Sequence, residues 1–290
     1  MIATSIDPGT CTRCGTCVAE CPVSAITLPP AGEGVPGPPP TIDSRCFGCG
    51  HCGAVCVAGA VRSESGDFPR WHAPHLEPQE VRAFLTGRRS VRRYRSDPLD
   101  PELLDELLSV APYAPTASHA QDVNASVLTR EQVFALASQV NDYYLWFENL
   151  LSRTYLRPLL WFTAARPYLK HPEKIESIRA PARAFDREHD WLFFGAPAVV
   201  VLTAPRKNAM FGRTNCVIAA ERIMQYGFAL GVGSCWIGYA EVALRRRRAI
   251  TDQLGIARDR AVHAVFTLGH PVPDYRRLPA RRPMAVASVG

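Results

Sequence analysis

Eight cysteines in two short blocks are the residues of this chain that point most directly to chemistry. The first block is Cys11-x2-Cys14-x2-Cys17-x3-Cys21, and the second repeats this spacing from Cys46 to Cys56. Three cysteines two residues apart let one tight loop direct three thiolates at a [4Fe–4S] cluster. The fourth cysteine is expected to start a short helix that leads away, so that it ligates the other cluster. The spacing therefore predicts one cluster on Cys11, Cys14, Cys17 and Cys56, and another on Cys46, Cys49, Cys52 and Cys21.

Structural zinc is the alternative for these blocks. Zinc sites use two separated CxxC pairs around one tetrahedral ion, whereas each block here has three cysteines followed by a fourth. Disulfides are a poorer explanation, because they need an oxidising compartment and are typical of small secreted domains. His51, inside the second block, is interpreted as an exposed or hydrogen-bonding residue and not as a ligand.

Residues 1–65 resemble the bacterial-type two-cluster ferredoxins, on the evidence of these duplicated cysteine runs. Two departures are visible: Val57 stands where a second proline would follow the fourth cysteine, and a proline- and glycine-rich loop, Pro29–Pro40, separates the halves. That loop is too rich in proline and glycine to form a strand or helix. Neither departure removes a ligand.

A basic segment, Arg88-Arg89-Ser90-Val91-Arg92-Arg93-Tyr94, forms a second chemical signature. The planar guanidinium suits phosphate, and the serine hydroxyl adds a donor. A basic run is more often a solvated face, so the elements around it decide its meaning.

Those elements follow in a recognisable order. Asp100 and Pro101 open a leucine-rich helix as N-cap and first residue. The loop APTASHAQ leads to a strand from Val123, and Thr129 with Gln132 predicts a capping box for the next helix. The remaining segments are the apolar strand AVVVLTA, a largely buried helix over 215–230 that stops at Gly231, the sequence GSCWIGY, and the buried strand AVHAVFTLGHP.

This order resembles the FMN-dependent nitroreductase family over about residues 80–290. The resemblance implies an α+β fold, with a nitroreductase-like mixed sheet flanked by helices and preceded by a small ferredoxin-like two-cluster domain. We therefore expect a two-[4Fe–4S] ferredoxin-like domain at 1–65, a linker at 66–79 and an FMN domain at 80–290.

The resemblance also implies which residues hold FMN. Arg88, Arg89 and Ser90 would meet the phosphate, joined by Arg281 or Arg282. Arg92 would lie beside the N1–C2=O edge, where a cation stabilises the anionic reduced flavin. Pro115, Thr116 and His119 would frame the ring and ribityl chain, and Ile237 and Gly238 would face N5.

His119 stands where the family commonly has asparagine. No residue is assigned with certainty to catalysis, since FMN carries the chemistry, and His119 is the one candidate for a proton donor. The simpler interpretation is that His119 hydrogen-bonds the cofactor. Cys235, next to the expected flavin site, is interpreted as a small buried hydrophobe.

Two further stretches have structural explanations. The aromatic-rich residues 143–162 are assigned first to core or dimer-interface packing and second to a lid over the flavin. Arg245 to Arg248 are expected to form a solvated face of a helix. No nucleic-acid-binding module accompanies them, so DNA or RNA binding is not supported.

Composition sets the remaining expectations. The chain has 290 residues, 47% hydrophobic and 21% charged, with a net charge of +6, which is typical of a globular protein that favours anionic ligands. No signal peptide or membrane span is visible in the sequence, so a cytoplasmic location is expected.

The function predicted from these features is an oxidoreductase. It would pass electrons from a low-potential donor through two [4Fe–4S] clusters to FMN, which reduces a small electrophile such as a nitroaromatic, a quinone or an activated double bond. One alternative is an NAD(P)H-dependent nitroreductase or quinone reductase that uses the clusters as electron exit or store. Another is a non-catalytic electron carrier. The external donor would be reduced ferredoxin or NAD(P)H, and the family implies a homodimer.

Overall fold

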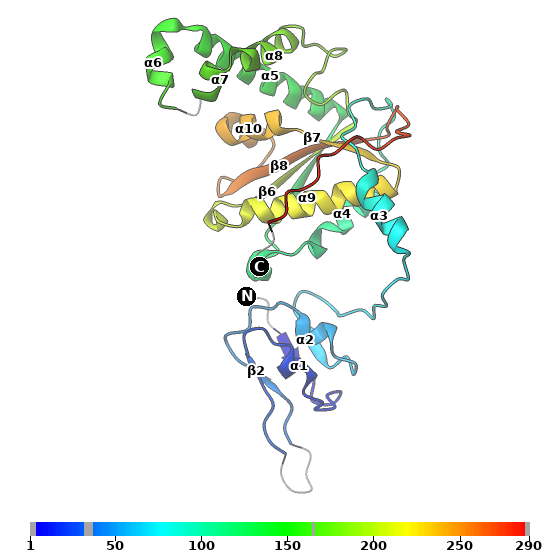
Figure 1. Cartoon of the computed structure of the whole chain (residues 1–290). Coiled ribbons are helices and arrows are strands. Elements are labelled where there is room, and N and C mark those ends of the chain that lie inside the picture. The colour runs from blue at the N-terminus through cyan, green and yellow to red at the C-terminus, as the bar shows by residue number, and fades with distance from the viewer. Residues whose placement is uncertain (1–3, 32–36, 164–165, 288–290) are drawn as a thin grey trace. The chain divides into compact units, whose positions relative to one another are not determined.

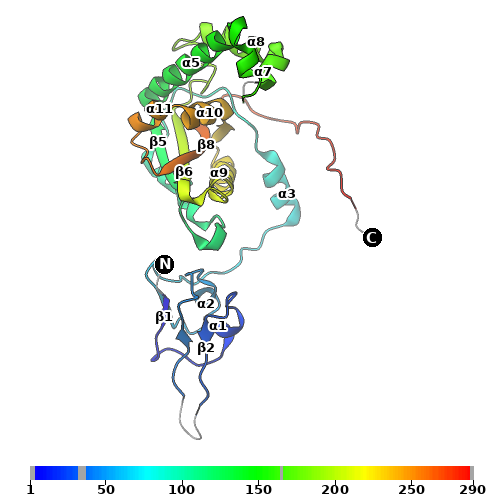
Figure 2. The same cartoon turned by 90° about the vertical axis from the view of Figure 1, so that its left-hand side faces the viewer.

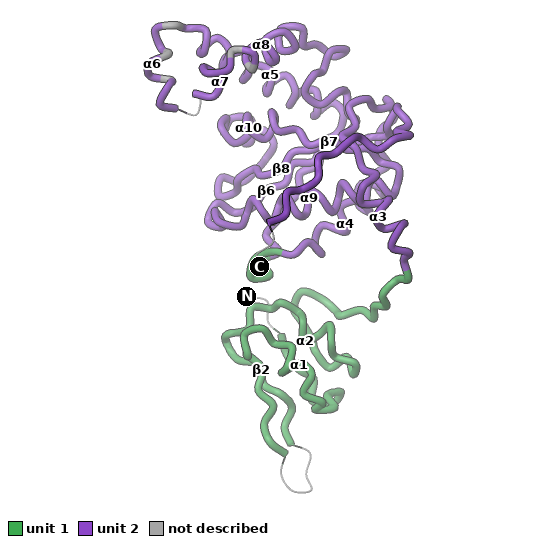
Figure 3. Tube along the Cα trace, viewed as in Figure 1, with its two compact units in different colours: residues 1–75, 116–120 green, residues 76–115, 121–290 purple. Residues whose placement is uncertain are grey.

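The computed structural model describes residues 4–31, 37–163 and 166–287. The chain divides into two compact units, which Figure 3 shows in two colours. Unit 1 comprises residues 1–75 and 116–120, and unit 2 comprises residues 76–115 and 121–290. The division between His75 and Leu76 falls inside the segment expected to be a linker.

Unit 1 is built from two similar halves. Strand β1 (Thr4–Ile6) pairs antiparallel with β4 (Val61–Ser63), and β2 (Ile26–Thr27) pairs antiparallel with β3 (Thr41–Ile42). Each half contributes one short helix, α1 (Thr16–Ala19) or α2 (His51–Ala54). The segment Pro29–Pro40 connects β2 to β3; its described residues are irregular, and residues 32–36 lie outside the described part of the chain.

The helices of unit 1 correct one expectation about the cysteine blocks. The fourth cysteine of each block was expected to start the helix, but α1 contains Cys17 and α2 contains Cys52, the third cysteines. The reason is the residue before each helix: Gly15 and Gly50 adopt left-handed φ values of 77° and 79°, which only glycine takes readily, and each starts the helix early. The fourth cysteines therefore follow the helices.

Unit 2 is organised around a four-stranded sheet with the order β5-β6-β8-β7. These strands are β5 (Asn124–Thr129), β6 (Ala198–Pro205), β7 (Gly233–Trp236) and β8 (Arg260–Gly269), and neighbouring strands pair antiparallel. A parallel bridge between Ser90 and Ser234 adds a further segment at the β7 edge, so the sheet is mixed, as predicted. The continuous apolar sequences of β6 and β8 are buried because both faces of the sheet are covered.

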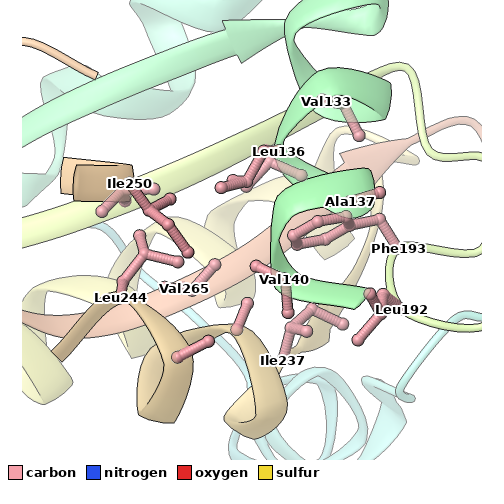
Figure 4. Packing of buried hydrophobic residues seen from close by; sticks show 14 of the residues in the cluster. Val133, Leu136, Ala137, Val140, Leu192, Phe193, Ile237, Leu244, Ile250 and Val265 are labelled. Atoms are coloured by element: carbon pink, nitrogen blue, oxygen red, sulfur yellow. The ribbon is translucent and has the colours of Figure 1, made fainter. Parts of the chain in front are cut away.

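Helices lie on both faces of this sheet (Figures 1 and 2). The long helix α9 (Gly212–Ala229) packs against one face, where Phe266, Leu202 and Ile223 belong to one buried cluster. Helices α5 (Arg130–Ser152) and α10 (Gly238–Arg246) cover the other face. Figure 4 shows this second cluster, in which Leu136 and Val140 of α5 lie near Leu244 and Val265.

The ends of these helices follow the local signals read from the sequence. Asp100 caps α4 (Pro101–Ser109), and its carboxylate accepts a hydrogen bond of 2.9 Å from the Glu102 amide. Thr129 and Gln132 form the predicted capping box at the start of α5. The helix after the linker, α3, spans Pro78–Gly87.

The aromatic stretch 143–162 divides into a buried and an exposed part. Tyr143, Tyr144 and Phe147 of α5 are buried, whereas Tyr155 and Phe162 are largely exposed. The exposed part belongs to a group of short helices that comprises α6 (Arg157–Leu160), α7 (Arg166–Lys170) and α8 (Pro172–Arg183). Core packing thus explains the first part of the stretch.

The expectation that Arg245 to Arg248 form one solvated helical face is wrong. Helix α10 ends at Arg246, and α11 (Arg248–Gln253) begins two residues later. The Arg247 guanidinium lies 3.9 Å from the ring centroid of Trp146, and Arg248 donates to the Ile256 carbonyl at 2.7 Å. These contacts hold the second pair of arginines against the protein. No helix within the described residues is long and apolar enough to cross a membrane.

Candidate functional site

The second cysteine block and Cys21 line one cavity in unit 1. The lining includes Cys46, Cys49 and Cys52 from the second block, together with Cys21 from the first. The fold therefore brings together the four residues predicted to share a cluster, although they come from both halves of the duplication.

The complementary set of cysteines gathers around Cys17. Burial raises the pKa of the Cys17 thiol, and the nearby Cys11, Cys14 and Cys56 raise it further. Cys11, Cys14 and Cys56 thus lie near Cys17, and thiolates are the ligands that an iron–sulfur cluster needs. Both groups have the composition predicted for crossed ligation, and the assignment of each cysteine to a cluster stays a prediction.

Backbone amides donate hydrogen bonds to several cysteine sulfurs. The amides of Ala25 and Ala60 each lie 3.2 Å from the sulfur of the fourth cysteine, Cys21 and Cys56 respectively. The Arg13 amide donates to Cys11 at 3.4 Å. All eight cysteines are free thiols, so no disulfide competes for them. Amide hydrogen bonds of this kind stabilise thiolate charge and tune the reduction potential of iron–sulfur clusters, so the residues present fit two such clusters.

The basic segment lies beside strand β7 in unit 2. The Val91 amide donates to the Ser234 carbonyl at 2.9 Å, and Ser90 forms a parallel bridge with Ser234. Two further backbone bonds fix the segment to the chain after β8: Arg95 donates to the His270 carbonyl, and Val272 donates to the Arg93 carbonyl. Arg88, Ser90 and Arg92 are consequently held along the edge of the sheet.

The side chains of this segment converge near Cys235. Burial raises the pKa of the Cys235 thiol, while Arg92, Ser90 and Arg88 lower it from close range. Next to Cys235, the Ser234 hydroxyl is buried and has no hydrogen-bond partner among the described residues. The thiol is 2% exposed, in agreement with its interpretation as a small buried hydrophobe. This concentration of donors and positive charge is chemically suited to the phosphate and the polar ring edge of FMN.

Arg88 and Arg92 each have one neighbour that orients them. Arg88 forms an ion pair of 3.5 Å with Glu221 of α9, whose side chain is about half exposed. Arg92 lies over the ring of Phe194 at 5.8 Å. Phe194 has a left-handed φ of 58°, and its loop is anchored by Asp190, which accepts hydrogen bonds from the amides of Leu192, Phe193 and Gly195.

Phe194 and Asp190 lie beside this basic segment without a sequence signal that assigns them to it. The signal available was the aspartate followed five residues later by glycine, a pattern typical of side chains that bond backbone amides in turns. That pattern predicts a tight loop, but it does not reveal that the loop carries an aromatic ring to Arg92.

Ile237 and Gly238 connect β7 to α10. The Ile237 amide donates to the Val265 carbonyl at 2.8 Å, and Gly238 is the first residue of the helix. A Cβ atom added at Gly238 would meet nothing within 4 Å, so there is open space beside this backbone. Gly238 is exposed, so this space is open to solvent, and the approach of the flavin N5 edge to this backbone stays a prediction.

The other residues predicted to hold FMN are Pro115, Thr116, His119, Arg89, Arg281 and Arg282. Pro115 ends the first part of the loop after α4, while Thr116 and His119 belong to segment 116–120, which groups with unit 1. Ser118 and His119 both have a left-handed φ of 51°. Arg89 donates to the Thr86 carbonyl at 2.8 Å. Arg281 and Arg282 are exposed in the extended segment after β8, and among the described residues no ion pair or hydrogen bond joins them to Arg88 or Ser90. The assignment of these residues to FMN remains a prediction.

Comparison with known families agrees with the resemblances seen in the sequence. The nitroreductase family model matches residues 85–270, and the model of the 4Fe-4S dicluster domain matches residues 10–60. No protein with a curated description matches the chain in sequence.

Solved structures show the same fold in unit 2. A nitroreductase with bound FMN from Desulfitobacterium hafniense is 18% identical, with a TM-score of 0.54, and the match covers 73% of this chain and 98% of that one. A nitroreductase with bound FMN from Bacteroides fragilis is also 18% identical, with a TM-score of 0.52, over 72% of this chain and 99% of that one. A BluB-like flavoprotein from Clostridium difficile gives 18% identity and a TM-score of 0.53, over 72% and 96%.

Proposed function

The chain belongs to the nitroreductase family of FMN-dependent oxidoreductases and carries a 4Fe-4S dicluster domain before it, and from this premise we propose its electron donor and substrate class. The donor is an external low-potential one-electron carrier. The substrate is a small electrophile that accepts an electron pair: a nitroaromatic, a quinone or an activated double bond.

The observation that supports the proposal is that two groups of four cysteines, each drawn from both blocks, and a group of donors and positive charge around Cys235 lie on one chain. When bound, the clusters transfer single electrons and FMN delivers electron pairs to a substrate. A covalent link between the two units raises their effective concentration for each other, which favours transfer within the chain over transfer between molecules.

The residues of unit 2 have distinct tasks in this proposal. Arg88 and Ser90 bind the phosphate, and Arg92 stabilises negative charge on the pyrimidine edge of the ring. The exposed backbone at Gly238, which follows the buried Ile237, leaves room for the reactive edge and the substrate above it. Arg281 and Arg282 would reach the phosphate from the extended C-terminal segment, within the homodimer that is typical of the family.

The experiment that tests this function starts from protein purified without oxygen. Iron, sulfide and FMN are counted per protomer, and about eight irons are expected from two four-iron clusters. Flavin reduction is then followed by stopped flow with reduced ferredoxin, NADH and NADPH in separate reactions. The proposal predicts faster reduction by ferredoxin than by either nicotinamide, and turnover with nitroaromatic, quinone or enone acceptors.

A matched pair of variants separates transfer through the clusters from direct reduction. Cys17→Ser removes a predicted ligand, whereas Cys216→Ser changes a buried cysteine outside both blocks. Reduction by ferredoxin should be lost in the first variant and kept in the second. Equal rates in both variants, or rapid reduction by NADPH alone, would refute the proposed donor.

A further inference from the structure

A polar cluster at the start of strand β8 has no task in the proposed flavin chemistry. It consists of one buried histidine, one buried glutamate and three arginines, and we call it the arginine cluster: His263, Glu241, Arg206, Arg213 and Arg245. It is distinct from the flavin site, because Cys235 pairs with Thr267, four residues further along β8, a separation of roughly 13 Å at the usual rise of a strand.

His263 owes its orientation to an irregularity in the sheet. Leu202 pairs with Ala264 and Thr203 pairs with Val262, so His263 is the extra residue of a β-bulge between β6 and β8. A bulge redirects a side chain relative to the normal alternation, and bulges are common next to functional sites. The imidazole consequently lies on the face of the sheet covered by α9.

Helix α9 begins next to the imidazole of His263. A Cβ added at Gly212, the first residue of α9, would lie 3.5 Å from Nε2 of His263 and 3.1 Å from the Ala204 Cβ. Gly212 therefore lets the helix start approach the ring closely. The start of this 18-residue helix carries a partial positive charge that attracts anions.

The charges of the cluster do not balance. The Glu241 carboxylate lies 3.5 Å from Arg245 and 4.0 Å from Arg213, and it also accepts a hydrogen bond from the Trp236 indole at 3.3 Å. Arg206 is fixed separately, since its guanidinium donates to the Arg258 carbonyl at 3.0 Å. Two carboxylates, Glu241 and Asp122, thus face three guanidinium groups at the positive end of a helix.

His263 is the buried polar group of the cluster. It is 8% exposed, and its Nδ1 atom is buried with no hydrogen-bond partner among the described residues. Burial lowers the pKa of His263, and Arg245, Arg213 and Arg206 lower it further, so the ring is neutral and one of its nitrogens carries a proton. A buried polar atom without a partner costs free energy unless a ligand or water satisfies it.

We propose that the arginine cluster is a binding site for a phosphate group, either free or carried by a nucleotide. Arg206, Arg213 and Arg245 supply the planar, charge-assisted donors that phosphate prefers, and the amides at the start of α9 supply neutral ones. His263 closes the inner side of the site. The surplus of positive charge favours an anion.

The test is calorimetric titration of the anaerobically purified full chain with inorganic phosphate, adenosine 2′-monophosphate and adenosine, at constant ionic strength set with chloride. Phosphate and the nucleotide should bind, and adenosine should not. Tighter binding of the nucleotide than of phosphate identifies a nucleotide source, and equal binding identifies the free anion.

Variants locate the binding. Arg213→Gln and Arg245→Gln should each weaken phosphate binding by about tenfold or more, the loss expected when one charge-assisted hydrogen bond is removed. Arg276→Gln makes the same change of charge at an arginine outside the cluster, 85% exposed at its side chain, and should leave binding unchanged. A second readout is the NMR signal of His263 in histidine-labelled protein, identified with His263→Gln, which should shift on phosphate addition. Equal affinity in all three arginine variants, or an unmoved His263 signal, would overturn the proposal.

Discussion

Substitution of Gly233 by alanine tests how closely the basic segment is held against β7. A Cβ atom at this position would lie 2.7 Å from Cγ2, 3.0 Å from Cβ and 3.1 Å from Cγ1 of Val91. Val91 is 4% exposed, and its amide is bonded to the neighbouring Ser234, so it has little freedom to withdraw. Overpacking of this kind costs about 1–3 kcal/mol, partly offset by about 0.5–1 kcal/mol because alanine suits a strand better than glycine.

The same contact predicts that a smaller residue at position 91 relieves part of the clash. Val91→Ala alone removes two methyl groups from a buried site and should cost about 2 kcal/mol. In the double variant the contacts with Cγ1 and Cγ2 are gone and only the 3.0 Å contact with the Cβ that alanine keeps remains, so its destabilisation should be smaller than the sum of the two single changes. The coupling free energy is then about 1–2 kcal/mol in favour of the pair.

The assays are urea unfolding of the four proteins of the cycle and titration of their apoproteins with FMN. Gly233→Ala should bind FMN roughly tenfold more weakly, since a displacement worth about 1.4 kcal/mol moves Arg88, Ser90 and Arg92. The double variant should recover part of that affinity. Additive stabilities in the cycle would refute the close contact, and unchanged FMN affinity in Gly233→Ala would refute the placement of the cofactor beside this segment.

Three further predictions concern the cysteine sets, the expected flavin site and the arginine cluster. Cys21→Ser should reduce the iron content from about eight to about four atoms per protomer and spare the cluster on Cys11, Cys14, Cys17 and Cys56. Paramagnetic resonance of the reduced protein shows which cluster remains. If the cluster on Cys11, Cys14, Cys17 and Cys56 is the one lost, the blocks are not crossed. Arg92→Gln should lower the two-electron midpoint potential of bound FMN, because it removes a cation beside the reduced ring, whereas Arg93→Gln should leave the potential unchanged. Stability should fall as the pH drops below about 6.5, since the folded state holds the pKa of His263 below its ordinary value and the unfolded chain takes up the proton first. Arg206, Arg213, Arg245 and Asp122 face His263, and His263→Gln should remove this component of the unfolding curve measured against pH.

Local signals in the sequence predicted the parts of the fold that depend on local physics. Asp100, Thr129 and Gln132 cap their helices as predicted, because a capping side chain bonds amides only two or three residues away. The repeat of cysteine spacing predicts the crossed sets as cluster ligands, since spacing limits which thiols one loop can present, and this assignment stays a prediction.

The features that the sequence did not reveal depend on contacts between distant residues. Phe194 lies beside Arg92, and Arg247 lies beside Trp146, across about a hundred residues of chain in each case. The bulge at His263 is equally invisible, because it is defined by the register of β8 against β6 and not by the composition of either strand. The roles of Thr116, His119, Arg281 and Arg282 depend on the cofactor and on the expected homodimer, and so they stay predictions.

The backbone bonds that fix residues 91–95 to Ser234, His270 and Val272 have a consequence for cofactor uptake. A segment tied at both ends is already in its binding shape before any ligand arrives, so little conformational entropy is lost on association. Reconstitution of the apoprotein should therefore behave as a simple bimolecular encounter, with a rate proportional to the flavin concentration and without a slow ordering phase.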